Sequence, residues 1–249
     1  FEEFLSAYKE GRDYTQTKNF WFKEKDQIIK NDFLPLQTQE DMDHLPLPLY
    51  ADNEFIFKNG SGFVPMDNSV YKDINGISYH TVWAIGCPYK CSFCGNSTFI
   101  ENDVDYKKIR HSSVSTIINE VKEVIRKHPY ISSVTFRDDA FIGLPNAVLK
   151  DFAKKWREEV NVGFSVVGAL PGLVAREKVK VLVKAGMSRI KMGIQSGSDN
   201  MLEFYKRPAT VAITNRAVSI IAEFTDYMIS PTYDIILDNP FDTDASLAE

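Results

Sequence analysis

The stretch of sequence that decides the fold reads Ile85-Gly86-Cys87-Pro88-Tyr89-Lys90-Cys91-Ser92-Phe93-Cys94-Gly95. It holds all three cysteines of the 249 residues, spaced Cys-x-x-x-Cys-x-x-Cys. Gly86 and Gly95 flank the cysteines and Pro88 interrupts them, which favours a loop whose backbone can curve around a bound group. Because four-iron clusters usually take four cysteine ligands, three thiolates predict a [4Fe-4S] cluster with one iron left without a protein thiolate.

Other interpretations of the three cysteines are open. A zinc site needs a fourth ligand, and the nearest histidines, His80 and His111, lie at no recognisable ligand spacing. The cysteines could also be buried thiols that bind nothing. A disulfide is less favoured, because three clustered cysteines without a signal peptide are typical of a reducing compartment, where this pattern indicates a metal.

The composition is that of an ordinary globular protein, with 44% hydrophobic and 25% charged residues. A net charge of -5 argues against general nucleic-acid binding. No apolar run approaches the length needed to span a bilayer, and the N-terminus does not read as a signal peptide. We therefore expect a cytoplasmic protein without a membrane span.

From about residue 77, predicted strands alternate with predicted helices, which indicates an α/β fold with a parallel sheet. The expected strands are 78–85, 131–136, 162–167, 188–194 and 228–237, and the expected helices are 112–127, 145–160, 176–185 and 210–224. The cysteines follow the first strand directly. In parallel barrels the carboxyl ends of the strands carry the active site.

Residues 1–75 lack this alternation and form a separate preface. A short helix is expected over residues 1–8, and a small hairpin is expected from 19–22 and 27–30. Leu45-Pro46-Leu47-Pro48 reads as an extended, proline-fixed segment.

The cysteine motif resembles that of the radical S-adenosylmethionine (SAM) enzymes, whose signature has an aromatic residue just before the last cysteine, as Phe93 is here. The resemblance implies that Cys87, Cys91 and Cys94 hold a [4Fe-4S] cluster and that Phe93 packs near the adenine of SAM. It also implies that the enzyme cleaves SAM reductively to methionine and a 5'-deoxyadenosyl radical. In such proteins the cofactor supplies the chemistry and the protein binds and orients it.

The resemblance implies further SAM contacts at strand ends. In Arg137-Asp138-Asp139-Ala140-Phe141, both aspartates stand where the family cradles the amino group of SAM, although its usual Gly-Gly-Glu form is absent. The alternative is that either aspartate only caps the next helix.

A second motif, Gly193-Ile194-Gln195-Ser196-Gly197-Ser198-Asp199, is followed by Arg207. By resemblance, Gln195, with Ser196 beside it, contacts the SAM ribose, and Arg207 pairs with the methionine carboxylate, chemistry that suits an amide and a guanidinium. Ser196 and Asp199 also match a capping box, so part of this motif could only begin a helix.

Asp234 matches a family aspartate that can reach the ribose. It lies in the otherwise apolar run Tyr233 to Leu237, where burying an unpartnered carboxylate would be costly. This cost favours a functional role for Asp234.

The preface resembles the linker that joins a cobalamin-binding domain to the radical core in one branch of the family, on loose motifs such as Gly11-Arg12-Asp13 and Asp43-His44-Leu45-Pro46. A surface meander with no such neighbour is the alternative. We therefore expect a linker over 1–75 and, over 76–249, a partial (β/α)6 TIM-like barrel whose last strand is missing. The first residue is not Met, so we expect a piece of a longer protein.

These motifs predict a radical SAM enzyme for cobalamin-linked methyl transfer or a related reaction, with cobalamin as a third cofactor. One alternative is a methylthiotransferase, whose motif also reads Gln-Ser-Gly-Ser-Asp but whose extra N-terminal cysteines are missing here. Another is a non-catalytic iron-sulfur or metal-binding module. The resemblance implies a small-molecule or peptide substrate and a low-potential electron donor such as flavodoxin or ferredoxin.

Overall fold

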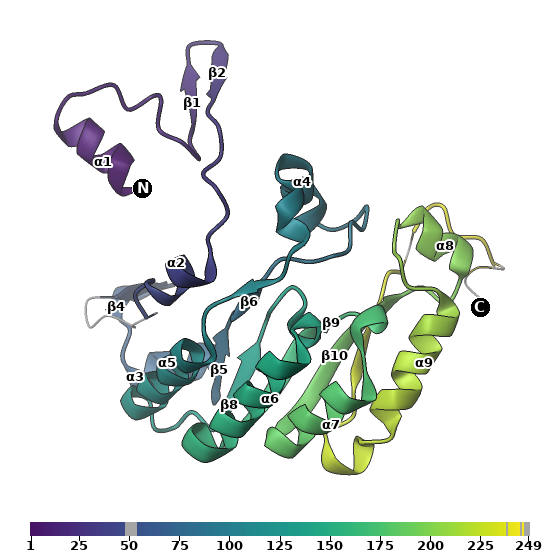
Figure 1. The fold of residues 1–249 in the computed structure, drawn as a ribbon. Coiled ribbons are helices and arrows are strands. Elements are labelled where there is room, and N and C mark those ends of the chain that lie inside the picture. The colour runs from purple at the N-terminus through teal and green to yellow at the C-terminus, as the bar shows by residue number, and fades with distance from the viewer. Residues whose placement is uncertain (48–53, 238, 245, 247–249) are drawn as a thin grey trace. The chain divides into compact units, whose positions relative to one another are not determined.

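The computed structural model describes residues 1–47, 54–237, 239–244 and 246. The chain forms two compact units, residues 1–37 (unit 1) and residues 38–249 (unit 2) (Figure 1). Of the predicted extended segment at residues 45–48, Pro48 lies outside the described residues.

Unit 1 contains a helix, α1 (Glu2–Lys9), and an antiparallel hairpin of β1 (Trp21–Glu24) and β2 (Gln27–Lys30). This confirms the predicted helix and hairpin. Stacked aromatic rings from the helix and the first strand region pack together, with 5.0 Å between the ring centroids of Phe4 and Phe20. Asn31 ties the loop to the hairpin by donating from Nδ2 to the carbonyl oxygens of Thr15 and Thr17.

Unit 2 is built on one five-stranded sheet in which every neighbouring pair is parallel. The strands are β5 (Ser78–Thr81), β8 (Ser133–Phe136), β9 (Gly163–Ala169), β10 (Met187–Gln195) and β11 (Thr232–Ile235), in the order β11-β10-β9-β8-β5. Within the described residues the sheet does not close, so the predicted α/β fold with a partial barrel is confirmed.

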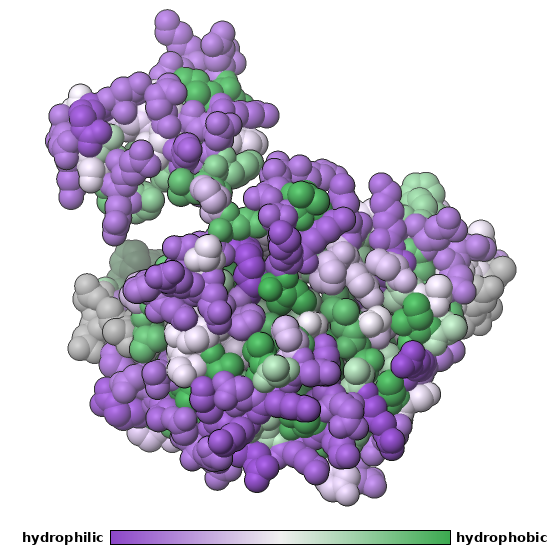
Figure 2. Space-filling view, viewed as in Figure 1, coloured by the Kyte–Doolittle hydropathy of each residue, from purple (hydrophilic) through white to green (hydrophobic). Residues whose placement is uncertain are grey.

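Helices cover one face of this sheet (Figure 1). They are α5 (Val114–Lys127), α6 (Asn146–Lys155), α7 (Arg176–Ala185) and α9 (Val211–Ala222). Ser113 and Thr210 cap the first and last of them by accepting backbone N–H groups, and Gly186 ends α7 at φ 109°. The outward surfaces of the helices are largely hydrophilic (Figure 2).

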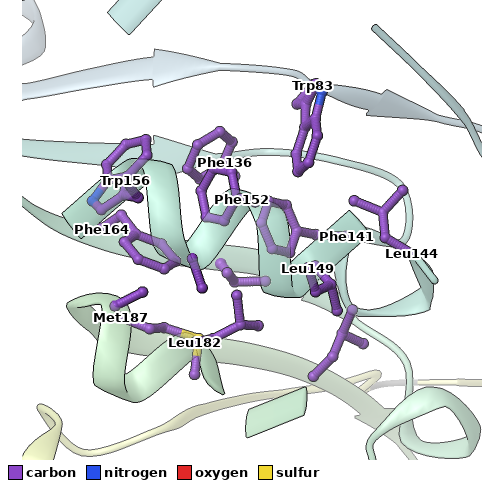
Figure 3. Close-up of a cluster of buried hydrophobic side chains, with 14 of the residues drawn as sticks. Trp83, Phe136, Phe141, Leu144, Leu149, Phe152, Trp156, Phe164, Leu182 and Met187 are labelled. Atoms are coloured by element: carbon purple, nitrogen blue, oxygen red, sulfur yellow. The ribbon is translucent and has the colours of Figure 1, made fainter. Parts of the chain in front are cut away.

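The core lies between the helices and the sheet and is dominated by aromatic rings (Figure 3). Phe152 on α6 is fully buried, and its ring centroid lies 5.1 Å from those of both Trp83 and Trp156. Phe136 and Phe164 bring the sheet into the same cluster. Burial of these rings anchors β8 and β9, whose carboxyl ends lead into the candidate site.

The structure differs from the expected elements in several places. The predicted strand 78–85 is two strands, because the chain bends after β5 and β6 (Ala84–Ile85) pairs antiparallel with β7 (Arg110–His111). The expected helix 145–160 ends in a π-helical turn, Trp156–Val160. Within the preface, the hairpin of β3 (Phe55–Lys58) and β4 (Gly62–Pro65) and the helix α3 (Asn68–Asn75) were not predicted.

The remaining elements are short. They are α2 (Gln39–Asp43), α4 (Asn96–Asn102), η1 (Val104–Lys107), η2 (Phe141–Gly143), η4 (Pro171–Leu173), α8 (Asp199–Phe204) and η5 (Thr225–Tyr227). In the described part of the chain, no helix has both the length and the apolar character that crossing a membrane requires.

Candidate functional site

The three cysteines lie in one loop, residues 86–95 (the cysteine loop), between β6 and α4. Cys87 and Cys91 are 7% and 5% exposed, Cys94 is half-buried, and all three are free thiols. Cys87 and Cys91 share a small buried cluster with Tyr89 and other residues, and Cys94 packs against it. The loop therefore places the three cysteines in one region of the fold, and their role as cluster ligands stays a prediction.

Backbone contacts hold the cysteine loop in shape. Gly86 has φ 110°, and a Cβ there would run into the carbonyl oxygens of Tyr106 and Lys108. Only glycine tolerates this combination of dihedral and close approach. Further along, the Cys94 N–H donates to the Cys91 carbonyl at 3.1 Å, and the Ser92 N–H donates to the Tyr205 carbonyl at 2.9 Å.

Asp138 and Asp139 brace the chain before and within this loop. Asp138, 2% exposed, accepts the N–H groups of Trp83 and Ala84, each at 2.9 Å. Asp139 accepts the Gly86 N–H at 2.9 Å. Neither aspartate caps the following helix, because α6 begins after Pro145 without a side-chain cap. The capping alternative is wrong, and contact of either aspartate with SAM stays a prediction.

Two contacts of Asp139 were not foreseen from the sequence. Asn96 Nδ2 donates to it at 2.8 Å, and the Tyr106 hydroxyl donates at 3.2 Å. Asn96 directly follows the cysteine motif, so its place in the sequence could have indicated a role at the site. Tyr106 lies in η1, and no sequence pattern indicated its contact with Asp139. Together they fix Asp139 against the start of the cysteine loop.

Arg207 connects the cysteine loop to the end of β10. It is 7% exposed, with Nη1 3.7 Å from Cys91 Sγ and Nη2 donating to the Gly193 carbonyl. Its guanidinium carbon lies 5.5 Å from the centroid of the Tyr89 ring. Arg207 Nε is buried and has no hydrogen-bond partner among the described residues. A buried cationic donor without a partner is costly, so this atom favours an acceptor that binds here.

Gln195 lies beside Arg207, as its spacing predicts. It ends β10 at φ 71°, an uncommon value for a residue with a side chain. A Cβ on Gly193 would collide with the Gln195 side-chain nitrogen and come within 3.5 Å of Arg207 Nη2. The absence of a side chain at Gly193 thus lets the amide and the guanidinium approach the same point.

The residues that follow Gln195 do not form the capping box that the sequence offered as an alternative. Ser196 Oγ accepts the Ser198 N–H at 3.1 Å, while Ser198 itself precedes α8. Asp199 accepts the Val211 N–H at 2.7 Å and so ties α8 to the start of α9. The Ser196–Asp199 capping box is therefore wrong, and a SAM contact by Ser196 stays a prediction.

Asp234 stands next to Gly193 in the paired register of β10 and β11. Its side chain is 47% exposed and pairs with Lys191 at 2.9 Å between Oδ1 and Nζ. The expected cost of a buried, unpartnered carboxylate does not apply, because β11 is an edge strand of the described sheet. Asp234 lies near the carboxyl end of β11, and its contact with the SAM ribose stays a prediction.

Phe93 is 46% exposed, and its ring meets that of Tyr205 edge to face with centroids 5.4 Å apart. Tyr89, by contrast, is buried, and its hydroxyl accepts the Gly172 N–H at 3.2 Å. The adenine contact of Phe93 stays a prediction. Tyr89, inside the cysteine motif, was not assigned a role from the sequence.

The electrostatics of the thiols bear on ligand binding. Burial raises the pKa of Cys87 to about 11, and burial also raises the pKa of Cys91 although the Arg207 charge opposes it. Ligation requires thiolates, so binding a metal here would release protons. Among the described residues no three His, Cys, Asp or Glu side chains are grouped to hold a metal ion. The donor chemistry of three cysteines suits an iron-sulfur cluster, and the unpartnered Arg207 Nε suits a ligand with acceptor groups.

Comparison with known families gives one match over most of unit 2. The family model of the radical SAM superfamily matches residues 82–249, which begin directly after β5 and include the cysteine loop, β10 and β11. No curated protein matches the sequence.

Two solved structures are similar in fold over almost the whole chain. The cobalamin-dependent SAM radical enzyme OxsB, with aqua-cobalamin and SAM bound, has a TM-score of 0.73 and 17% identity, covering 99% of this chain and 33% of OxsB. The radical SAM methyltransferase TsrM from Kitasatospora setae, with tryptophan and a SAM analogue bound, has a TM-score of 0.69 and 17% identity, covering 98% of this chain and 46% of TsrM. The chain thus spans less than half the length of either protein.

Proposed function

Because the chain belongs to the radical SAM superfamily, we propose that it forms the cluster-binding and SAM-binding part of an enzyme that cleaves SAM reductively. The observation that carries this proposal is the position of Arg207, buried between Cys91 Sγ and the Gly193 carbonyl with Nε unpartnered. One residue thereby links the three-cysteine loop to the strand end that bears Gln195.

In this proposal Cys87, Cys91 and Cys94 hold a [4Fe-4S] cluster, and Arg207 and Gln195 orient SAM. The guanidinium suits a carboxylate and the amide suits a diol. When bound, the cluster and SAM supply one-electron cleavage of the sulfonium to methionine and a 5'-deoxyadenosyl radical. Asp139 keeps the cysteine loop in register through the Gly86 N–H.

The wider reaction that we propose is cobalamin-linked methyl transfer or a related step. Support comes from the fold likeness to OxsB and TsrM, which extends over residues that precede the family match. A low-potential donor such as flavodoxin or ferredoxin would supply the electron. Cobalamin would be held mainly by parts of the protein outside this sequence.

The test is anaerobic reconstitution of the full-length protein, followed by iron and sulfide analysis and by chromatography of 5'-deoxyadenosine formed from SAM and dithionite. We expect about four irons per chain and formation of 5'-deoxyadenosine. Cys91→Ala should lose the cluster and this product. Ser219→Ala, on the exposed side of α9, serves as the control and should retain both.

Wild-type iron content in Cys91→Ala would contradict the ligand assignment. A full-length protein that is loaded with the cluster and never forms 5'-deoxyadenosine, even with cell extract as a source of substrate, would favour the non-catalytic module instead.

A further inference from the structure

The inner face of the sheet, opposite the helices, carries polar side chains on every strand, together with the apolar Val167 on β9. Residues on this face include Ser78 and His80 on β5, Thr135 on β8, Ser165 on β9 and Lys191 on β10. Parallel sheets are usually apolar on both faces, because both faces are normally buried. A polar inner face therefore indicates contact with water or with a polar ligand.

These side chains line a cavity of about 590 Å³ on the inner face. Every strand of the sheet contributes to its wall, from β5 at one edge to Thr232 on β11 at the other. Its size is within the usual range for small-molecule sites. Gln195 ends β10 of this sheet, and the chain continues from β5 through β6 to the cysteine loop.

The cavity carries an excess of positive charge. Arg137, Arg189 and Lys191 line it, and Asp234, paired with Lys191, supplies a carboxylate next to it. The exposed side chain of Arg189 makes no hydrogen bond or ion pair within the described part of the chain. Two guanidinium groups thus remain without a carboxylate partner there.

Arg137 is held in place by a neutral neighbour. Its Nε donates to His80 Nδ1 at 2.7 Å. Because a guanidinium nitrogen can only donate, His80 Nδ1 is the acceptor and carries no proton. Burial lowers the pKa of His80, and the charge of Arg137 lowers it further, in the same direction. The bond orients the guanidinium without neutralising its charge.

Building on the proposed function, we propose that this cavity binds a carboxylate or phosphate group of the substrate, with Arg137 and Arg189 as its contacts. Guanidinium groups form paired, charge-assisted hydrogen bonds with both kinds of anion. The hydroxyls of Ser165 and Thr135 on neighbouring strands can add neutral hydrogen bonds. The assigned substrate class is a small anionic molecule.

The test is isothermal titration calorimetry of the full-length protein at low salt with glutarate, phenyl phosphate and the neutral analogue glutaramide. We expect at least one anion to bind and glutaramide not to bind. Arg189→Gln and Arg137→Gln should each weaken the anion by roughly 10- to 100-fold, as loss of a charge-assisted hydrogen bond predicts. Arg216→Gln, which removes the same charge from the exposed side of α9, should bind like the wild type.

Preference for glutarate or for phenyl phosphate would assign the anion as carboxylate or phosphate. Equal binding of glutaramide, no binding of either anion, or wild-type affinity in both arginine variants would overturn the proposal. Dithionite-driven SAM cleavage is measured separately on the wild type. Anion binding without SAM cleavage would reject the proposed function and leave the anion site standing, whereas SAM cleavage without anion binding would reject only the anion site.

Discussion

The two faces of the sheet in unit 2 differ sharply although the same strands make both. Toward the helices, the alternating residues are fully buried and apolar: Val134, Phe136, Phe164, Val166, Ile190 and Met192. On the inner face, the residues between them are mainly polar or charged. Residues on the helix side therefore stabilise the fold, whereas those on the inner face are available for binding, so mutations on the two faces should separate stability from ligand affinity.

Phe164→Ala gives the largest expected effect. The Phe164 side chain is 0% exposed and packs against Trp156 with ring centroids 5.1 Å apart. Truncation should lower the free energy of unfolding by about 3–5 kcal/mol through lost burial and a cavity. Urea denaturation measures this loss of unfolding free energy, and Phe33→Ala, at a half-exposed position, is the control. A loss similar to that of the control would show that the helix side of the sheet does not carry the stability of unit 2.

Asp138, two residues beyond the end of β8, is a buried carboxyl group, and its contribution to stability should depend on pH. Burial raises its pKa from 3.8 to about 7, although the hydrogen bonds from Trp83 and Ala84 oppose the rise. The folded state therefore holds a proton that the unfolded state releases between about pH 4 and pH 7. The free energy of unfolding contributed by Asp138 falls as the pH rises through this window.

Asp138→Asn should cost about 1–3 kcal/mol at pH 5, because an amide oxygen cannot replace both acceptors of the Trp83 and Ala84 N–H groups. The deficit relative to wild type should shrink toward pH 7.5, since the variant does not titrate. Urea denaturation across this range is the measurement, with exposed Asp226→Asn as the control. A deficit that is constant with pH would show that Asp138 stays ionised.

Ser165→Ala gives the smallest expected effect and is the matched partner of Phe164→Ala, one residue along the same strand. Ser165 lines the inner cavity, and its hydroxyl makes no hydrogen bond within the described residues. The free energy of unfolding should change by no more than about 0.5 kcal/mol. A loss above about 1 kcal/mol by urea denaturation would mean that the inner face also contributes to stability.

Most of the fold of unit 2 is predictable from the sequence, because regular alternation of strand and helix patterns indicates a parallel sheet. Helix α7 has the predicted bounds because Gly186 stops it. The two-residue strands β6 and β7 were missed because they depend on each other across the chain, with Ile85 opposite Arg110. No pattern of neighbouring residues in the sequence predicts such a pairing.

The candidate site is predictable to a different degree for each residue. Spacing singles out the cysteines as candidate ligands, and the family resemblance singles out Gln195 and Arg207, which the structure places beside each other. Tyr106 was missed because its bond to Asp139 depends on how η1 packs. The polar inner face has a sequence signal in the two-residue period of Ser133, Thr135 and Arg137, which marks one face of a strand.

The edge position of β11 gives this chain a surface through which it can self-associate. In the described sheet one side of Thr232–Ile235 faces no neighbouring strand, and Ile229 and Ile235 close by are 56% and 57% exposed. Open backbone groups beside exposed aliphatic side chains are a template for strand addition between molecules. Residues 1–249 expressed alone should self-associate through β11. Mild detergent or the substitution Ile235→Lys should restore a monodisperse sample.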